Sequence, residues 1–179
     1  MNPIRYYEGD RIYFRPFELS DEPLLRAWVN DPANWSTLGR FAPVNALREE
    51  EWIRSRYTDP SEFSFGVVLK ESDALIGSCG LFGIDQISRR AELGILIGPD
   101  EMKNRGYGTE AVRLLTRWGF LQLNLNRIFL RVMVGNDGAL RSYEKAGFLL
   151  EGRCRQSFYR DGSYRDELIY AILREEYQD

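Results

Sequence analysis

The chain has 179 residues, the size of one domain at roughly 100 to 200 residues per domain, so a single domain over residues 1–179 is expected. Hydrophobic residues make up 44% and charged residues 28%, a balance that predicts a folded core and excludes a disordered or fibrous chain. The formal charge of −3 argues against a nucleic-acid binder, which needs a surplus of Lys and Arg to release counterions.

The sequence contains no histidine, which excludes a Ser-His-Asp or Cys-His nucleophile and a zinc site with imidazole ligands. A general base must therefore be a carboxylate, Lys, Tyr, Cys or water. Cys79 and Cys154 are expected to be free thiols of a cytoplasmic protein, because the N-terminus lacks the pattern of a secretory segment. No metal site is expected, and no membrane span, because the longest apolar stretches are far shorter than the roughly 20 residues required.

The first half of the chain is predicted to open with one strand and two helices. Side-chain alternation indicates a strand over residues 11–17. Ser20 is expected to cap a helix that ends near Asn30, and an acidic start with an apolar stripe indicates a second helix over residues 45–57. Prolines and a glycine predict a loop over residues 31–44, between the two helices.

Three strands then follow, over residues 63–69, 74–82 and 90–97, and the short turn clusters between them predict an antiparallel meander. Helical spacing of apolar residues next indicates a helix over residues 109–123, and a strand pattern returns over residues 127–134. A strand, a helix and a strand in this order form a βαβ crossover, so the two flanking strands should be parallel.

The last part of the chain is predicted to hold a short helix over residues 137–146, ended by Gly147, and a hairpin. The hairpin strands, residues 148–159 and 164–173, flank the turn signal Asp161-Gly162. The whole pattern predicts an α+β fold with a mixed, largely antiparallel sheet of about seven strands and helices on both faces.

The sharpest local feature is the segment KNRGYGTEA, residues 103–111, between the third meander strand and the following helix. Gly106 and Gly108 would let a ligand approach the backbone closely, and the free N–H groups at the helix start form an anion site. A diphosphate would suit such a site. Taken alone, the two glycines are equally consistent with a simple turn.

The same residues also spell G-x-G-x-x-A, the pattern of dinucleotide-binding folds. In those folds the first glycine follows its strand directly, whereas here the residues PDEMKNR stand between Gly98 and Gly106. In addition, no acidic residue stands at a strand end about 20 positions after Gly108. A nicotinamide or flavin site is therefore disfavoured.

Two motifs together resemble those of the GNAT superfamily of acyl-CoA-dependent N-acetyltransferases. Residues 103–108 match its acetyl-CoA motif, which is a Gln or Arg, two variable residues, Gly, one variable residue and Gly or Ala, with Lys in the first place here. The downstream motif is matched by Asn136, Ala139, Tyr143, Lys145, Gly147 and Phe148. Residues 151–173 are also similar to the C-terminal hairpin of the ribosomal-protein alanine (RimJ/RimL-like) and spermidine acetyltransferase branches.

The resemblance implies that acetyl-CoA lies where the two parallel strands of the βαβ unit splay apart. Its pyrophosphate would lie on the amides at the helix start, and its pantetheine arm would pair with the exposed backbone edge of the strand at 90–97. The residues assigned to acetyl-CoA in this way are Leu96, Ile97, Gly98, Lys103, Asn104, Arg105, Gly106, Tyr107, Gly108, Thr109, Asn136 and Tyr143.

The chemistry of acetyl transfer needs a neutral amine to attack the thioester, although a free alkylammonium has a pKa near 10. The amine must therefore lose a proton, and the departing thiolate must be stabilised or protonated. The resemblance places Tyr143 in the family's general-acid position and Glu92 where many members have a base. Packing of Tyr143 on its helix, a solvated Glu92 and a helix-capping Asn136 remain the alternatives.

The expected function is acetyl transfer from acetyl-CoA to a primary amine by direct attack in a ternary complex, and a non-catalytic acyl-CoA-binding module is the alternative. No motif fixes the acceptor, which could be a protein N-terminus, a polyamine or another small amine. Trp35, Phe41 and Tyr159 are the candidate substrate-binding residues, and core packing is the alternative for the two loop aromatics, Trp35 and Phe41. Because family members often dimerise, a homodimer is one expected assembly, although no segment marks its interface.

Overall fold

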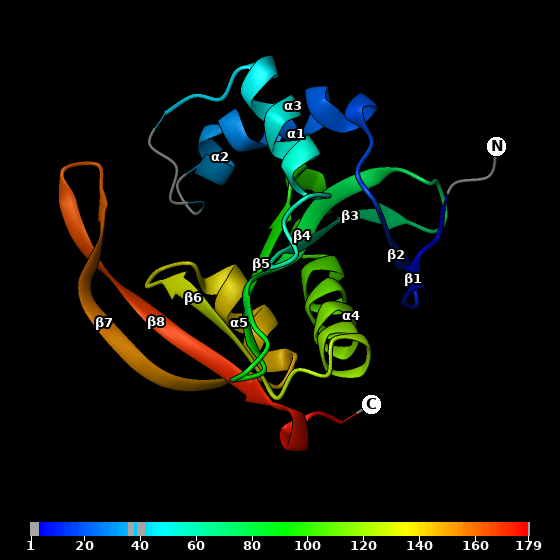
Figure 1. The fold of residues 1–179 in the computed structure, drawn as a ribbon. Helices are drawn as coiled ribbons and strands as arrows, with labels where there is room; N and C mark the ends of the chain where they lie inside the picture. The colour runs from blue at the N-terminus through cyan, green and yellow to red at the C-terminus, as the bar shows by residue number, and fades with distance from the viewer. Residues whose placement is uncertain (1–3, 36–37, 39–41, 179) are drawn as a thin grey trace.

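The computed structural model describes residues 4–35, 38 and 42–178. Within these residues eight strands form one sheet, in the order β1-β2-β3-β4-β5-β6-β8-β7 (Figure 1). Neighbouring strands are antiparallel except β5 and β6, which are parallel. The predicted α+β fold, with a mixed, largely antiparallel sheet and a βαβ crossover, is therefore confirmed.

The strands are β1 (Tyr7–Glu8), β2 (Ile12–Arg15), β3 (Phe63–Leu69), β4 (Leu75–Asp85), β5 (Arg90–Ile97), β6 (Arg127–Met133), β7 (Leu149–Arg160) and β8 (Ser163–Leu173). The helices are α1 (Glu22–Asn30), α2 (Pro32–Trp35), α3 (Ala46–Ser55), α4 (Tyr107–Gln122) and α5 (Asp137–Lys145), with single 3-10 turns at Leu19–Asp21, Asp100–Met102 and Arg174–Glu176.

Short elements account for the differences from the sequence prediction. The two-residue β1 is a strand that the pattern did not reveal, and the four-residue α2 lies in the predicted loop. Ser20 does not cap α1, because it lies inside a 3-10 turn and Asp21 occupies the residue before the helix. The Asp21 carboxylate instead accepts the N–H of Glu18 at 2.8 Å and pairs with Arg15 at 2.7 Å.

The sheet is covered on both faces, as predicted, by two layers of helices (Figure 1). On one face α4 and α5 pack over a large apolar cluster that includes Ala91 and Leu93 of β5. On the other face α1 and α3 enclose Trp28 and Ile53, and Leu96 of β5 packs against them. Alternation along β5 therefore sends its odd-numbered side chains toward α4 and its even-numbered ones toward α1 and α3.

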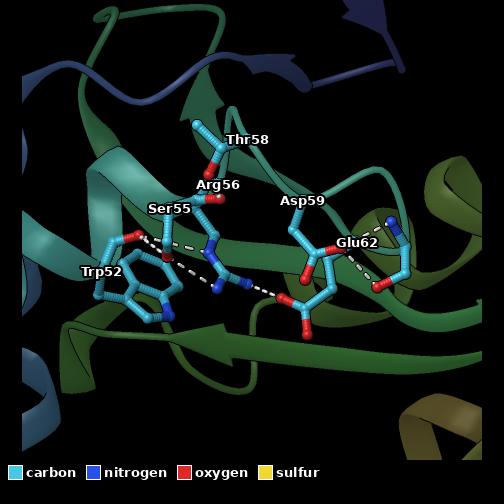
Figure 2. Close-up of polar contacts among 7 residues, drawn as sticks. Trp52, Ser55, Arg56, Thr58, Asp59 and Glu62 are labelled. Carbon is cyan, nitrogen blue, oxygen red and sulfur yellow. Dashed lines mark hydrogen bonds and ion pairs between the residues drawn. The ribbon is translucent and has the colours of Figure 1, made fainter.

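An arginine clasp joins the end of α3 to the start of β3 (Figure 2). The guanidinium carbon of Arg56 lies 5.2 Å from the centre of the Trp52 ring. Its Nε donates to the Trp52 carbonyl at 3.3 Å, its Nη2 donates to the Ser55 hydroxyl at 3.0 Å, and its Nη1 pairs with the Glu62 carboxylate. The clasp links the C-terminal end of α3 to the residue just before β3.

Cys79 is buried, Cys154 is half-buried, and both are free thiols, as expected. No helix among the described residues is long and apolar enough to cross a membrane. In the same part of the chain, no three His, Cys, Asp or Glu side chains are grouped as they would be around a metal ion.

Candidate active site

The parallel strands β5 and β6 separate soon after they begin. Their pairing runs from Arg90 opposite Arg127 to Glu92 opposite Phe129, and no later pair joins them within the described residues. Both strands continue beyond this point, β5 to Ile97 and β6 to Met133. The edge of β5 after Glu92 is therefore open, as expected for a splayed parallel pair.

The register of β4 and β5 shows which backbone groups point into this opening. Gly98 donates its N–H to the carbonyl of Ile76 at 3.0 Å, so it belongs to a hydrogen-bonded pair. Such pairs alternate along an antiparallel ladder, so Leu96 also directs its N–H and C=O toward β4. Ile95 and Ile97 direct theirs to the opposite edge, which faces the opening. Of the three residues predicted to pair with the pantetheine arm, Ile97 therefore faces the opening, whereas Leu96 and Gly98 face β4.

The loop before α4 has the geometry of an anion site. Asn104 and Gly106 are both left-handed, with φ of 59° and 86°. The first backbone bond of the helix runs from the N–H of Glu110 to the carbonyl of Gly106, at 3.0 Å. The N–H groups of the preceding helical residues, 107–109, consequently have no acceptor within the helix. These amides, with the helix dipole behind them, suit a diphosphate.

The two sequence motifs meet at Gly108. A Cβ built on Gly108 would lie 3.8 Å from Cγ1 of Ile97 and 3.8 Å from Oγ of Ser142, the residue before Tyr143. A Cβ on Gly138, in the first turn of α5, would lie 3.9 Å from Oδ1 of Asn104. The end of β5, the start of α4 and the inner side of α5 therefore converge on one place.

Three glycines near this place have different physical roles. Gly106 supplies a left-handed conformation that side chains disfavour. Gly98 supplies space, because a Cβ there would lie 2.1 Å from the Trp28 ring. Gly108 supplies neither, since its φ is not positive and an added Cβ would make only ordinary van der Waals contacts. The fold therefore does not require glycine at position 108, which agrees with a role in ligand approach.

Tyr143 lies on α5 and is 7% exposed, with its ring centre 6.2 Å from that of Phe148. Its hydroxyl has no hydrogen-bond partner among the described residues. Burial disfavours the phenolate and raises the pKa of Tyr143 to about 12. The phenol is thus protonated throughout the neutral range, so its proton is present for donation at neutral pH.

Glu92 lies on the opposite face of the sheet from Tyr143. It stands in register between Phe82 of β4 and Phe129 of β6, on the β5 face that carries Leu96. The irregularity between β4 and β5 falls between Phe82 and Asp85, so the β5 alternation is intact from Glu92 to Ile97. The half-buried carboxylate has no hydrogen bond or ion pair to any described residue. Its oxygens are therefore not occupied by another described side chain.

Lys103 and Asn136 use their side chains within the protein. The Lys103 Nζ donates to Asn34 Oδ1 and to Asp100 Oδ1, each at 2.6 Å. Asn34, which the sequence did not single out, is 1% exposed and donates to the carbonyls of Trp28 and Gly98 at 3.1 Å. It thereby joins α2 to the end of β5.

Asn136 caps α5, because its Oδ1 accepts the N–H of Ala139 at 3.3 Å. The side-chain oxygen of Asn136 therefore has the helix-capping role that was the alternative to ligand binding. Its side-chain NH2 group is not used in the cap and can donate to a ligand. Arg105 lies in the anion loop, and Thr109 lies in the first turn of α4.

A groove of about 450 Å³ runs beside the start of α4. Gly106 and Thr109 line one end, and Arg113 and Lys145 line its side, where Arg113 donates to the Lys145 carbonyl. The cationic side chains make this groove suitable for an anionic group.

The candidate acceptor residues come from separate segments. The Arg160 guanidinium lies 4.9 Å from the centre of the Trp35 ring and donates to the Trp35 carbonyl, which joins the tip of the β7–β8 hairpin to α2. Tyr159 is 49% exposed, with its ring centre 5.1 Å from that of Tyr164. Phe41 lies outside the described residues.

Comparison with known proteins identifies the same chemistry. The acetyltransferase (GNAT) domain family matches residues 11–149. Spermidine N(1)-acetyltransferase of Escherichia coli (strain K12) is 35% identical over 170 residues, covering 93% of this chain and 88% of that protein. The putative ribosomal N-acetyltransferase YdaF of Bacillus subtilis (strain 168) is 34% identical over 128 residues, covering 72% of this chain and 68% of that protein.

Among solved structures, that of spermidine N-acetyltransferase from Vibrio cholerae in complex with CoA and spermine matches with a TM-score of 0.87. The two sequences are 27% identical, and the match covers 94% of this chain and 98% of that one.

Proposed function

The chain belongs to the GNAT family and is an acetyl-CoA-dependent N-acetyltransferase, and we propose that it transfers the acetyl group at the junction of β5, α4 and α5. The observation that carries the proposal is the convergence of these elements on Gly108, a glycine that the fold itself does not need. An open strand edge, an anion loop and a buried phenol all belong to this junction.

Acetyl-CoA would be held along this junction by backbone groups and cations. The pantetheine amides would pair with the free edge of Ile95 and Ile97, as an added strand pairs with a sheet edge. The pyrophosphate would accept hydrogen bonds from the N–H groups of residues 107–109. Arg113 and Lys145 would attract the remaining phosphate into the groove beside α4.

The acetyl group would then pass directly from sulfur to nitrogen. The amine nitrogen forms a bond to the thioester carbonyl carbon, and the carbon–sulfur bond breaks when the tetrahedral intermediate collapses. A bound ammonium loses two protons overall. Glu92, directly or through water, takes the first before attack, the nitrogen loses the second to water after attack, and Tyr143 gives its proton to the departing thiolate. Glu92 then releases its proton to solvent and the phenolate is reprotonated from solvent, so each turnover releases one net proton and returns both side chains to their starting states.

An amine that is already neutral when it binds is the second way to supply the nucleophile, and it leaves Glu92 without a role. The two routes differ in the pH dependence of a Glu92→Gln variant.

The acceptor is a small-molecule amine or a protein N-terminus. We favour a small amine, because the relatives that match over most of this chain include spermidine acetyltransferases. Trp35 and Tyr159, near the joined ends of α2 and the β7–β8 hairpin, would contact the part of the acceptor that does not react. The homodimer stays a prediction, which light scattering from the purified chain would test.

The direct test uses purified protein, acetyl-CoA and a panel of amines: a polyamine, amino acids, an amino sugar and a peptide with a free N-terminus. Release of the CoA thiol, with an acetyl mass added to one amine, is the expected result. If small amines are inert and only the peptide is acetylated, the small-molecule assignment is wrong while the proposed site stands.

A further inference from the structure

One side chain from the N-terminal strands reaches the anion loop, although it is far from that loop in sequence. Nη1 of Arg11 donates to the carbonyl of Arg105 at 3.0 Å, across 94 residues of chain. Nε of Arg11 donates to Oε2 of Glu110 at 2.9 Å, across 99 residues. The guanidinium carbon also lies 4.6 Å from the centre of the Tyr107 ring.

The same contact is reinforced from the backbone. Oε1 of Glu110 accepts the N–H of Arg11 at 2.7 Å and the N–H of Ile12 at 3.2 Å. Gly9 leaves the space for this carboxylate, because a Cβ at that position would lie 2.9 Å from Oε1 of Glu110. Both oxygens of the Glu110 carboxylate therefore accept hydrogen bonds from Arg11 and Ile12, which joins the start of β2 to the first turn of α4.

These contacts act on a loop, residues 104–106, that makes few other hydrogen bonds within the described part of the chain. Asn104, Arg105 and Gly106 are exposed, and two of the three are in the left-handed conformation. A loop that must be ordered when a ligand binds weakens binding by the entropy of that ordering. The Arg11 fork fixes the carbonyl just before Gly106 and the helical turn just after it.

We propose that Arg11 is a positioning residue for acetyl-CoA: it holds the loop at 104–106 and the first turn of α4 in the conformation that presents the amides of residues 107–109 to the pyrophosphate. The proposal rests on the proposed function of that loop. Arg11 also lines the groove beside α4, but it touches none of the reacting atoms, so it affects the binding of acetyl-CoA and not the acetyl-transfer step.

The fork geometry separates positioning from simple charge attraction. An arginine can donate to Arg105 and Glu110 at once, because its nitrogens are fixed in one plane. A lysine keeps the positive charge but has one ammonium group, which cannot reproduce this pair of contacts. Arg11→Lys should therefore resemble Arg11→Gln, whereas a charge effect alone would be restored by lysine.

The experiment compares Arg11→Gln and Arg11→Lys with a matched control, Arg5→Gln. Arg5 also carries an ion pair, to Asp73 at 2.9 Å, and lies 4.9 Å from the centre of a tyrosine ring, that of Tyr13, but it has no hydrogen bond or ion pair to the loop among the described residues. Steady-state rates are measured with acetyl-CoA and with acetyl-pantetheine, which lacks the diphosphate.

Both Arg11 variants should raise the KM for acetyl-CoA about fivefold to tenfold, while kcat changes less than about twofold. Their kcat/KM with acetyl-pantetheine should equal that of the parent, and Arg5→Gln should match the parent with both substrates. A parent-like KM for acetyl-CoA in Arg11→Gln, or full rescue by Arg11→Lys, would overturn the proposal. An equal loss with both substrates would also overturn it, since a general defect of folding moves both.

A second variant covers the case in which the Arg11 variants do not fold. Glu110→Gln keeps the size of the side chain but weakens its pairing with Arg11, and it should raise the KM for acetyl-CoA in the same selective way.

Gly108→Val separates the inference from its premise. If Gly108→Val weakens acetyl-CoA binding and the Arg11 variants do not, only the role of Arg11 is wrong; if Gly108→Val also binds normally, the proposed pyrophosphate site is wrong.

Discussion

Replacing Tyr143 by Phe removes one oxygen atom from a buried ring and separates its catalytic role from its packing role. The ring of Tyr143 packs near Phe148 and is 7% exposed, and these contacts remain in the variant. The hydroxyl has no hydrogen-bond partner among the described residues, so its removal leaves no described donor or acceptor newly unpaired. We expect the free energy of unfolding at pH 8 to change by less than about 1 kcal/mol.

The effect on turnover should be large by comparison. Loss of a general acid lowers the rate of a chemical step by about 10² to 10⁴, and we expect kcat of Tyr143→Phe to fall within that range. Because burial raises the pKa of Tyr143 to about 12, the phenol does not titrate between pH 7 and 10. The ratio of parent to variant kcat should therefore be constant over this range, measured by release of the CoA thiol.

The raised pKa of Tyr143 also gives a stability test that is independent of activity. The folded state prefers the protonated phenol, so this group contributes stability that is fully present below pH 10 and is lost as the pH rises through about 12. At pH 11 the unfolded phenol is mostly ionised and the folded one is not, which corresponds to about 1.4 kcal/mol. Urea unfolding at pH 8 and pH 11 should show the parent losing about this much more than Tyr143→Phe.

An unchanged kcat in Tyr143→Phe, with the chemical step shown to limit turnover, would refute the assignment of the general acid. A parent-to-variant ratio that disappears between pH 8 and 10 would refute the argument from burial, because it would mean that the phenol ionises at an ordinary pKa. The urea experiment tests the raised pKa without measuring turnover, so it shows whether the burial argument or the general-acid assignment is wrong.

Substitutions at three further positions test separate parts of the site. Gly108→Val should weaken acetyl-CoA binding at least tenfold, about 1.4 kcal/mol, in calorimetry, and Gly108→Ala should keep the parent melting temperature because its Cβ has room. Glu92→Gln should lower kcat/KM near pH 7 and recover part of it at high pH, and superimposable pH profiles would remove Glu92 from the mechanism. Gly98→Ala should lower the free energy of unfolding by about 1 to 3 kcal/mol in urea, because its Cβ would lie 2.1 Å from the Trp28 ring; a parent-like value would mean that the ring moves aside freely.

The long elements could be predicted from the sequence because each has a repeated local signal. Alternation over residues 90–97 and helical spacing after Gly108 are enough to define β5 and α4 to within a few residues. The two residues of β1 and the four of α2 are too short to show any period, so tertiary contacts decide them. The same applies to Ser20, whose good capping chemistry was overridden when Asp21 paired with Arg15.

The motif residues of the site could be predicted from local sequence, whereas the side chains that hold them in place could not. Gly106 and Gly108 could be singled out in the sequence because they stand two positions apart where the helical pattern of α4 begins. Asn34 and Arg11 are not visible, because each meets its partner far along the chain: Asn34 and Lys103 are 69 positions apart. Backbone direction was also hidden: only the register of β4 and β5 shows that Ile95 and Ile97, and not Leu96 or Gly98, face the opening.

The opening between β5 and β6 explains how groups on opposite faces of one sheet can serve a single reaction. Glu92 belongs to the face covered by α1 and α3, and Tyr143 belongs to the cluster under α4 and α5. A continuous parallel pair would fill the space between them with backbone hydrogen bonds and keep the two side chains apart. Because pairing stops at Glu92, a thioester in the gap would meet the carboxylate from one face and the phenol from the other. Proton removal from the amine and proton delivery to the thiolate would then occur on opposite sides of the reacting carbon, which keeps the acid and the base from neutralising each other.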